Sequence, residues 1–347
     1  MYRFNNDYNK TCHPYVLEYL SGCKNQYSGY GEDDICSSAA KLLRERSDCP
    51  DADVHFLNGG TQTNLTVICA ALRPHQGVIC AQTGHIHVHE TGAIEASGHK
   101  IITVPSVDGK IEASQVEALV IAQRESQDAV HFVQPKLVYI SNPTEYGTLY
   151  NYKQLEELSV LCRKLDLLLY VDGARMGYAL TAEDNDVSLA DIARLTDAFY
   201  IGGTKCGAMF GEAVVITNPG LSEDFRYIMK QRGAMLAKGW LLGAQFCALF
   251  ESDLYFKICS QANEYADLIR ARLSELNLPL FITTSTNQIF PIISNDILEE
   301  LQKKFSFAYW EKYDEDHSVV RFCTSWSTTA IEVDALCEEL KNLMMKH

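Results

Sequence analysis

Short, nearly continuous hydrophobic runs recur along the chain from about residue 50. Seven of them have the length of a strand: "VHFL" (54–57), "GVICA" (77–81), "KIITVP" (100–105), "KLVYIS" (136–141), "LLLYVD" (167–172), "DAFYIG" (197–202) and "AVVIT" (213–217). Runs without a polar face predict strands that are buried on both sides. Stretches typical of helices lie between most of them, at 61–72, 87–97, 113–123 and 153–164. This alternation predicts a largely parallel α/β sheet with right-handed crossovers.

The two ends of the chain have a different pattern. A polar, tyrosine-rich arm and a helix occupy residues 1–45, and long helical stretches begin near residue 237. Two short strands follow, "QIFPII" and "VVRFCTSW", and the acidic run "EKYDEDH" between them is most simply a solvated turn. We therefore expect an arm with a helix at 1–45, a large α/β domain at 46–235 and a smaller α+β domain at 236–347.

Composition and charge narrow the class of protein. The chain has 347 residues, 47% of them hydrophobic and 22% charged, as in globular proteins. No apolar run approaches the roughly 20 residues of a membrane span, and the N-terminal residues lack the apolar core of a secretory signal, so we expect a cytoplasmic protein. The net charge of −15 disfavours nucleic acid or an anionic membrane as a partner. Twelve scattered cysteines without a CxxC pair are expected to be reduced.

A candidate anion site follows the first strand in "NGGTQTN" (58–64). The glycines allow close approach of a ligand, Thr61 is a candidate N-cap, and the free N–H groups of a helix start attract an anion. The alternative is an ordinary strand-to-helix turn. Because an exposed helix dipole contributes only about 0.3–1 kcal/mol, a phosphate dianion would need a cation as well. The absence of GxGxxG and of a Walker lysine disfavours a nucleotide site.

Charged side chains stand at or within two apolar strands. Asp172 ends a strand in "YVDGARMG", with Arg175 three residues later. A buried carboxylate needs a positive partner, so Asp172 either pairs with Arg175, caps a turn or holds a protonated ring nitrogen, with Arg175 facing a ligand oxygen or carboxylate. Arg321 interrupts the apolar "VVRFCTSW". It serves either a structural salt bridge or a planar carboxylate ligand.

Two further segments carry polar side chains where predicted strands end. "TGHIHVHE" (83–90) places three histidines at alternate positions, which diverge on a helix, so a three-histidine metal site is not expected. His85 is suited to stack on a flat cofactor, whereas His87 and His89 are expected to be surface or interface residues. Asn142 in "YISNPTEYG" either donates a hydrogen bond to a ligand oxygen or only shapes the turn.

A single lysine, Lys205, lies among glycines in "YIGGTKCGAMF" (200–210). Lysine is usually solvated, but an amine in a partly desolvated, electropositive corner loses its proton readily and forms a Schiff base with an aldehyde. A carboxylate such as Asp172 would keep a pyridine ring protonated and therefore electron-accepting. The joint occurrence of Asp172, Lys205 and Arg321 favours an enzyme that uses pyridoxal 5'-phosphate (PLP).

"FLNGGTQTN", "GHIHVHETGAIEASGHK", "YVDGAR", "GGTKCGAMFGEA" and "VRFCTSW", in this order, resemble the threonine aldolase/β-eliminating lyase family. The resemblance covers essentially the whole chain. It implies the PLP-dependent transferase fold of aspartate aminotransferase (fold type I), with a large, mainly parallel seven-stranded sheet domain and a smaller C-terminal domain. The implied activity is cleavage of a threonine-like β-hydroxy-α-amino acid to glycine and an aldehyde. A β-eliminating lyase, an aminotransferase and a PLP-binding protein without catalysis are the alternatives.

The resemblance also implies roles for single residues. Lys205 would form the Schiff base, Asp172 would contact the pyridine nitrogen, and His85 would stack on the ring and is the best candidate for the catalytic base. The implied cofactor-binding residues are Gly60, Thr61, Gln62, His85, Asn142, Asp172, Arg175, Thr204, Lys205, Arg232 and Lys238. The implied substrate-binding residues are Asp7, Tyr30, Arg175 and Arg321.

Members of this family build active sites at a subunit interface, which implies a homodimer or homotetramer. "GYGED" (29–33) and "KQRGAMLAKG" (230–239) would then come from the neighbouring subunit, and the second would supply a phosphate-binding cation from Lys230, Arg232 or Lys238. In two places this sequence departs from many threonine aldolases. "SNPTEYG" has no histidine where they carry "ENTHN", and "NNDYN" replaces "SDTVT". These departures affect the expected substrate, not the expected cofactor.

Overall fold

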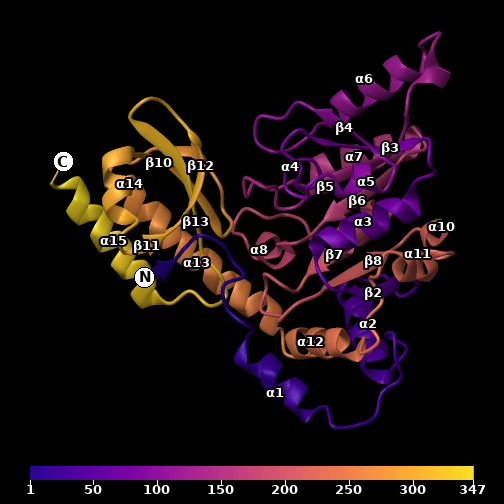
Figure 1. Cartoon of the computed structure of the whole chain (residues 1–347), viewed down its shortest axis with the longest axis horizontal. Coiled ribbons are helices and arrows are strands. Elements are labelled where there is room, and N and C mark those ends of the chain that lie inside the picture. The colour runs from indigo at the N-terminus through magenta and orange to yellow at the C-terminus, as the bar shows by residue number, and fades with distance from the viewer. Residues whose placement is uncertain (347) are drawn as a thin grey trace.

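A seven-stranded sheet forms the centre of the larger part of the molecule (Figure 1). The structure is a computed structural model and describes residues 1–346. In spatial order the strands are β2 (Asp53–Leu57), β8 (Glu212–Ile216), β7 (Ala198–Gly202), β6 (Leu168–Asp172), β5 (Gln134–Ser141), β3 (Gln76–Ala81) and β4 (Lys100–Val104). Only β8 runs against the others, pairing antiparallel with both β2 and β7. The predicted seven-stranded, mainly parallel sheet is confirmed.

Successive residues of each strand are buried on opposite faces of the sheet. In β6, Leu169 and Val171 join one hydrophobic core, whereas Tyr170 joins the other. Helices cover both faces, so the strands have no polar side and appear as unbroken hydrophobic runs in the sequence. On the first face lie α1 (Pro14–Gly22), α2 (Asp34–Arg46), α6 (Ala113–Arg124), α7 (Tyr152–Lys164), α8 (Met176–Leu180), α9 (Leu189–Leu195) and α12 (Trp240–Phe250). On the second lie α3 (Gly60–Ala71), α4 (His85–Val88), α5 (Ala93–Ala96), α10 (Pro219–Ser222) and α11 (Phe225–Gln231).

The predicted helix at 87–97 is wrong as a single element. The segment forms two one-turn helices, α4 and α5, separated by Thr91 with φ of +53° and Gly92 with φ of +70°. Left-handed backbone at two successive positions cannot continue a right-handed helix. The long helical stretches predicted over 237–275, with breaks, are confirmed as α12 and α13 (Leu254–Glu275), and the break falls at Asp253, with φ of +57°.

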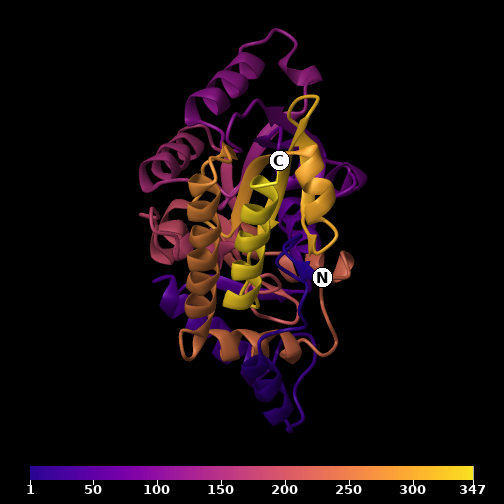
Figure 2. The same cartoon turned by 90° about the vertical axis from the view of Figure 1, so that its left-hand side faces the viewer.

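A smaller domain is built on a four-stranded antiparallel sheet. Its order is β12 (Ala308–Lys312), β13 (His317–Cys323), β10 (Gln288–Ser294) and β9 (Leu280–Ile282). Helices α13 and α15 (Ala330–Met344) run side by side against it, and α14 (Asn295–Leu301) packs beside α15 (Figure 2). The acidic run forms the exposed turn between β12 and β13, which confirms that prediction.

The N-terminal arm connects the two domains. Strand β1 (Tyr2–Arg3) pairs in parallel with β11 (Phe305–Ser306) of the small domain, and Phe4 is buried in the core of that domain. The chain then passes the cavity described below and reaches α1, which packs against α12 beside the large sheet. The boundaries at residues 46 and 236 stay predictions, but the first residues of the arm pack as part of the small domain.

Three further features complete the description of residues 1–346. The twelve cysteines are all free thiols. Within residues 1–346, no helix is long and apolar enough to cross a membrane. A short 3-10 helix, η1 (Ala129–His131), precedes β5.

The loops that follow β6 and β7 touch each other backbone to backbone at Gly202. A Cβ atom there would lie 2.3 Å from the carbonyl oxygen of Ala174, so a side chain would push apart the two loops that carry Asp172 and Lys205. We predict that Gly202→Ala lowers the free energy of unfolding by about 1–3 kcal/mol, as overpacking does elsewhere, and lowers the midpoint of thermal unfolding. The matched control is Gly22→Ala, because no atom lies within 4 Å of that Cβ position. A Gly202→Ala protein with the same midpoint of thermal unfolding as the wild type would contradict the prediction.

Candidate active site

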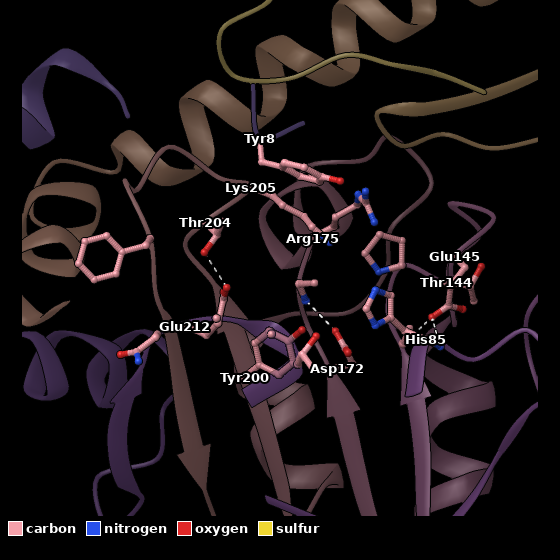
Figure 3. A pocket seen from close by; sticks show the side chains of 18 residues that line it. Tyr8, His85, Thr144, Glu145, Asp172, Arg175, Tyr200, Thr204, Lys205 and Glu212 are labelled. Atoms are coloured by element: carbon pink, nitrogen blue, oxygen red, sulfur yellow. Dashed lines mark hydrogen bonds between the residues drawn. The ribbon is translucent and has the colours of Figure 1, made fainter. Parts of the chain in front are cut away.

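A cavity of about 350 Å³ opens where β2, β5, β6 and β7 end, at the edge of the sheet where ligands of α/β proteins bind (Figure 3). Seven residues expected from the sequence line it: Gly60, Thr61, His85, Asp172, Arg175, Thr204 and Lys205. They come from four segments that are far apart in the sequence. The fold therefore brings most of the expected site together in one place.

Asp172 is the buried carboxyl at the end of β6, with only 4% of its surface exposed. Its Oδ2 accepts hydrogen bonds from Tyr139 Oη at 2.6 Å and Asn64 Nδ2 at 2.9 Å, and its Oδ1 accepts one from the Ala174 N–H at 3.0 Å. Burial alone would raise the pKa of Asp172, but the nearby His85 and these donors lower it. The side chain is therefore held as a carboxylate. It does not pair with Arg175, so the internal ion pair considered from the sequence is not formed.

Lys205 lies in the loop between β7 and β8, and its side chain is half-buried. The loop is fixed because Gly203 and Thr204 donate backbone hydrogen bonds to the Gly211 carbonyl and Tyr178 Oη donates to the Lys205 carbonyl. Within the described chain, no hydrogen bond or ion pair holds its Nζ. Burial and then the charge of Arg175 lower the pKa of Lys205. This is the direction that a nucleophilic amine requires.

His85 begins α4, and its ring is fixed by a carboxylate. Nδ1 lies 2.8 Å from Glu90 Oε1, and the same oxygen accepts a hydrogen bond from Asn64 Nδ2 at 2.8 Å. Asn64 thus joins Asp172 to Glu90 and, through Glu90, to His85. With Nδ1–H donating to Glu90, Nε2 is the ring atom that is left to accept a proton. His89 lies 5.4 Å from this ring, between centroids, and lines the adjoining cavity, so it is closer to the site than expected.

Arg175 is neutralised by the N-terminal arm. Its Nε and NH2 donate to the two oxygens of Asp7, at 2.6 and 3.0 Å, and Asn287 Nδ2 donates to Asp7 at 3.0 Å. Asp7 is 1% exposed and does not line the cavity. Its carboxylate binds Arg175 and does not face the space that a substrate would occupy. Burial raises the pKa of Asp7, but Arg175, Lys205 and Arg321 together lower it to about 2.

Arg321 retains an uncompensated charge. Its NH1 donates to Gln288 Oε1 and its NH2 to the Asn5 carbonyl, both at 3.0 Å, and its buried Nε has no partner. No carboxylate among the described residues pairs with it, so the structural salt bridge considered from the sequence is not formed. Arg321 lines a second cavity, of about 580 Å³, that shares Tyr8, His85, Arg175 and Lys205 with the first. A carboxylate ligand would find an available guanidinium here.

Several expected residues do not line either cavity. Asn142 is 2% exposed and accepts a hydrogen bond from the Tyr150 N–H, so it shapes the turn. Gln62 Nε2 lies 3.5 Å from the carbonyl of Arg232, and Lys238 is exposed. Tyr30 lies beneath the amine of Lys230, 4.3 Å from its ring centre, and lines a different pocket. Any part that these residues play from a neighbouring subunit stays a prediction.

The start of α3 also differs from the expectation. Its N-cap is Gly59, which makes no side-chain cap hydrogen bond, and Thr61 is the second residue of the helix. Thr61 as an N-cap is therefore wrong, because the glycine takes that position with extended backbone. The first N–H groups of the helix consequently face the cavity without a side-chain acceptor.

Sequence reasoning missed other polar groups of the cavity. These are Tyr8, Glu145, Tyr200 and Glu212, together with Asn64, Tyr139 and Glu90 in the hydrogen-bond network behind it. Two of them, Tyr139 and Tyr200, lie inside buried strands, and Glu212 begins one. A polar side chain inside an unbroken hydrophobic run was the available signal.

This fold and this site define a class of protein: PLP-dependent enzymes with the architecture of aspartate aminotransferase. The aspartate aminotransferase of Thermus thermophilus superimposes with a TM-score of 0.71 at 15% identity, covering 98% of this chain and 96% of that chain, which shows the shared fold. A family model described as "Beta-eliminating lyase" matches residues 23–296. The chain belongs to the beta-eliminating lyase family, which confirms the resemblance seen in the sequence.

Two individual relatives are similar over nearly their whole length. The structure of a threonine aldolase from Leishmania major is 46% identical, with a TM-score of 0.96, and the match covers 99% of this chain and 100% of that one. A low specificity L-threonine aldolase from Pseudomonas sp. (strain NCIMB 10558) is 29% identical over 319 residues, 91% of this chain and 90% of that protein. This chain is a PLP-dependent lyase.

The donor set of the cavity fits PLP. An amine with a lowered pKa, Lys205, and an ionised carboxylate, Asp172, line the same cavity. The uncapped start of α3 offers N–H groups to a phosphate at Gly60 and Thr61. Within residues 1–346, no three His, Cys, Asp or Glu side chains are grouped so that they could hold a metal ion.

The buried pair of Asp7 and Arg175 generates a prediction about stability. We expect Asp7→Asn to lower the free energy of unfolding at pH 7 by about 3–5 kcal/mol, because it leaves a buried guanidinium without its counter-charge. The pKa of Asp7 is lowered from an ordinary 3.8 to about 2, so its contribution is complete above about pH 4 and is lost as the pH falls towards 2. The difference in free energy of unfolding between the wild type and Asp7→Asn should therefore become smaller as the pH falls from about 4 towards 2.

Thermal unfolding followed from pH 7 to pH 2.5 checks this expectation. Asp51→Asn, at an exposed turn residue, is the matched control and should behave as the wild type. An Asp7→Asn protein with an unchanged midpoint at pH 7 would show that the pair does not stabilise the fold.

Proposed function

We propose that the protein is a PLP-dependent aldolase that cleaves a β-hydroxy-α-amino acid, threonine or a close relative, into glycine and an aldehyde. The observation that carries this proposal is the joint lining of adjoining cavities by Lys205, Asp172 and the unpaired Arg321. These are an amine for the cofactor, a carboxylate for its ring and a cation for the substrate. The similarity to the threonine aldolases of Leishmania major and Pseudomonas supports the choice of reaction.

We assign the cofactor contacts as follows. When bound, PLP supplies an aldehyde that reacts with amines and a ring that accepts electrons from the bond being broken. Lys205 holds it through its amine, and Asp172 keeps the ring nitrogen protonated by remaining ionised. The N–H groups at Gly60 and Thr61 face the phosphate, and the hydroxyl of Thr204 lies on the same wall of the cavity.

Arg321 binds the carboxylate of the substrate. Gln288 and the Asn5 carbonyl hold its guanidinium in place without neutralising it. Asp7 neutralises Arg175, so the N–H groups on its NH1 contribute hydrogen bonds to the substrate carboxylate or the cofactor oxygen, not a net charge. The two arginines therefore differ in role: one attracts the substrate and the other positions it.

His85 takes the proton of the β-hydroxyl, directly or through a water molecule. Its Nδ1 is engaged by Glu90, which leaves Nε2 as the accepting atom and supports the charge that the ring gains. The same hydrogen bond fixes the orientation of the ring. Glu90 is thus a positioning residue for His85.

A β-eliminating lyase reaction is the second candidate, favoured by the description of the family model. Transamination is the third, since the fold is also that of aspartate aminotransferase. Elimination releases a keto acid and ammonia, and transamination requires a keto-acid acceptor, whereas aldol cleavage releases an aldehyde without one. A homo-oligomer with shared active sites and a cytoplasmic location stay predictions.

Aldehyde release from L-threonine by the purified, PLP-loaded protein tests the proposal. We expect release without an added acceptor, and we expect Lys205→Ala to abolish both the release and the visible absorption band of the bound cofactor, because the amine that holds it is gone. Lys153→Ala, at an exposed lysine of α7, is the control and should keep both. The aldolase assignment would be overturned if the wild type showed the absorption band of the bound cofactor but released no aldehyde from threonine or from bulkier β-hydroxy amino acids. The assignment of the cofactor would then still hold.

A second prediction concerns the substrate carboxylate. Arg321→Gln should raise KM for the amino acid by about tenfold or more, since a charge-assisted hydrogen bond is worth roughly 1.5–3 kcal/mol, while the visible cofactor band stays unchanged. Steady-state kinetics together with the absorption spectrum separate the two effects. Arg272→Gln, on the surface of α13, is the control. A normal KM in Arg321→Gln would remove this arginine from the substrate site.

A further inference from the structure

Glu212 is a buried carboxyl in the wall of the active-site cavity to which the proposed reaction gives no role. It is the first residue of β8 and is 4% exposed. Its Oε1 accepts a hydrogen bond from Thr204 Oγ1 at 2.7 Å, and its Oε2 accepts one from the Gly203 N–H at 2.9 Å. Among the described residues, no arginine, lysine or histidine forms an ion pair with it. Both oxygens are thus fixed by neutral donors, and a negative charge here would have no ion-pair partner among these residues.

Glu212 stands beside the proposed phosphate site. In the ladder between β2 and β8 its partner is Leu57, which is followed directly by Asn58, Gly59 and the start of α3. Glu212, Thr204 and Gly60 line the same cavity. Figure 3 shows Glu212 and Thr204 together at one side of the cavity, away from His85 and Glu145 at the other. A phosphate at the start of α3 would therefore meet this carboxyl, not the groups around His85.

The groups around Glu212 favour its neutral form. Burial and, to a smaller extent, Asp172 raise the pKa of Glu212, whereas the hydrogen bonds from Thr204 and Gly203 and the charge of Lys205 lower it; the balance raises this pKa to about 7. The other titratable groups facing it are the phenols of Tyr170 and Tyr200, which are uncharged because burial raises their pKa. A phosphate ester carries a charge of about −1.5 to −2 at pH 7. Its arrival would disfavour a second negative charge still more.

We propose that Glu212 takes up a proton from solvent when the phosphate of PLP binds beside it, so that a carboxylic acid faces the phosphate. The inference rests on the placement of the phosphate in the proposed function. Glu212 is thus a positioning residue for the cofactor, and its protonation state depends on pH. It makes affinity for the phosphorylated cofactor fall as the pH rises through neutrality.

The direction of the pH effect follows from the proton count. Below about pH 7 Glu212 already carries its proton, so phosphate binding needs none. Above that value each bound phosphate requires one proton, and affinity falls by up to about tenfold for each pH unit. The phosphate is itself dianionic throughout this range, because its second pKa is roughly 6.

Comparison of PLP with pyridoxal isolates the phosphate. Pyridoxal lacks the phosphate and has the same ring and aldehyde carbon, so the pH dependence that Lys205 and Asp172 contribute is common to both ligands and cancels in the ratio of the two dissociation constants. The full-length protein, stripped of cofactor, is titrated with each ligand by absorbance between pH 7 and 8.5. In the wild type we expect the advantage of PLP over pyridoxal to fall by about tenfold over this range. In Glu212→Gln, which is neutral at every pH, we expect the advantage to stay constant.

Glu145→Gln is the matched control, because Glu145 is a buried carboxyl of the same cavity on its other side. In Glu145→Gln, the advantage of PLP over pyridoxal should fall with pH as steeply as it does in the wild type. A constant PLP advantage in the wild type, or an unchanged slope in Glu212→Gln, would overturn the inference and leave the proposed function standing. A wild-type protein that binds neither ligand would overturn both.

Proton uptake provides a measurement that needs no variant. In weakly buffered solution at pH 8, binding of PLP should take up close to one proton more than binding of pyridoxal. Equal uptake for the two ligands would overturn the inference even if Glu212→Gln failed to fold.

Discussion

The active site depends on one carboxylate that stays ionised in the interior. Asp172 is almost fully buried, and burial alone would neutralise it. Donors from β5, from α3 and from the loop after β6 offset that cost. Because Asn64 also bonds Glu90, and Glu90 bonds His85, the same hydrogen bonds that keep Asp172 charged fix the ring of His85. The sheet edge, the start of α3 and the histidine are thus held in one arrangement.

The N-terminal arm gives the two arginines different electrostatic surroundings. Its Asp7 neutralises Arg175, and the Asn5 carbonyl binds Arg321 without contributing a counter-charge. Phe4 anchors the arm in the core of the small domain, so both contacts depend on that docking. The charge that Arg321 presents to the cavity is therefore set by a segment that joins the two domains. The proposed substrate site and the relative position of the domains are linked through these few residues.

The hydrophobic pattern was enough to predict the sheet, because strands buried on both faces leave unbroken apolar runs. Lys205, Asp172 and Arg321 were predictable for a related reason: each is a charge placed at or near such a run. The pairing of Asp7 with Arg175 was not, since the two residues are 168 positions apart and only the folded arm brings them together. Position at the end of a strand also says nothing about where a side chain points. Asn142, which follows β5, accepts a hydrogen bond from Tyr150 and does not line the cavity. Gln62, in the first turn of α3, likewise lies beside the Arg232 carbonyl and not in the cavity lining.

Glu212 illustrates what an acidic protein must do to hold an anionic cofactor. The net charge is −15, and of the cations near the cavity Arg175 is already neutralised by Asp7. The start of a helix contributes only about 0.3–1 kcal/mol at an exposed site, whereas two unit charges of like sign 5 Å apart repel by roughly 3 kcal/mol at an effective dielectric constant of 20. Removing one negative charge from the wall of the cavity therefore matters more than adding one helix dipole. Thr204 and Gly203 can hold Glu212 in place whether or not it carries a proton, because each donates to an oxygen and the acid form keeps an accepting lone pair on both. A buried carboxyl without an ion-pair partner is compatible with a phosphate site for this reason: the proton that it binds removes the negative charge that would repel the phosphate.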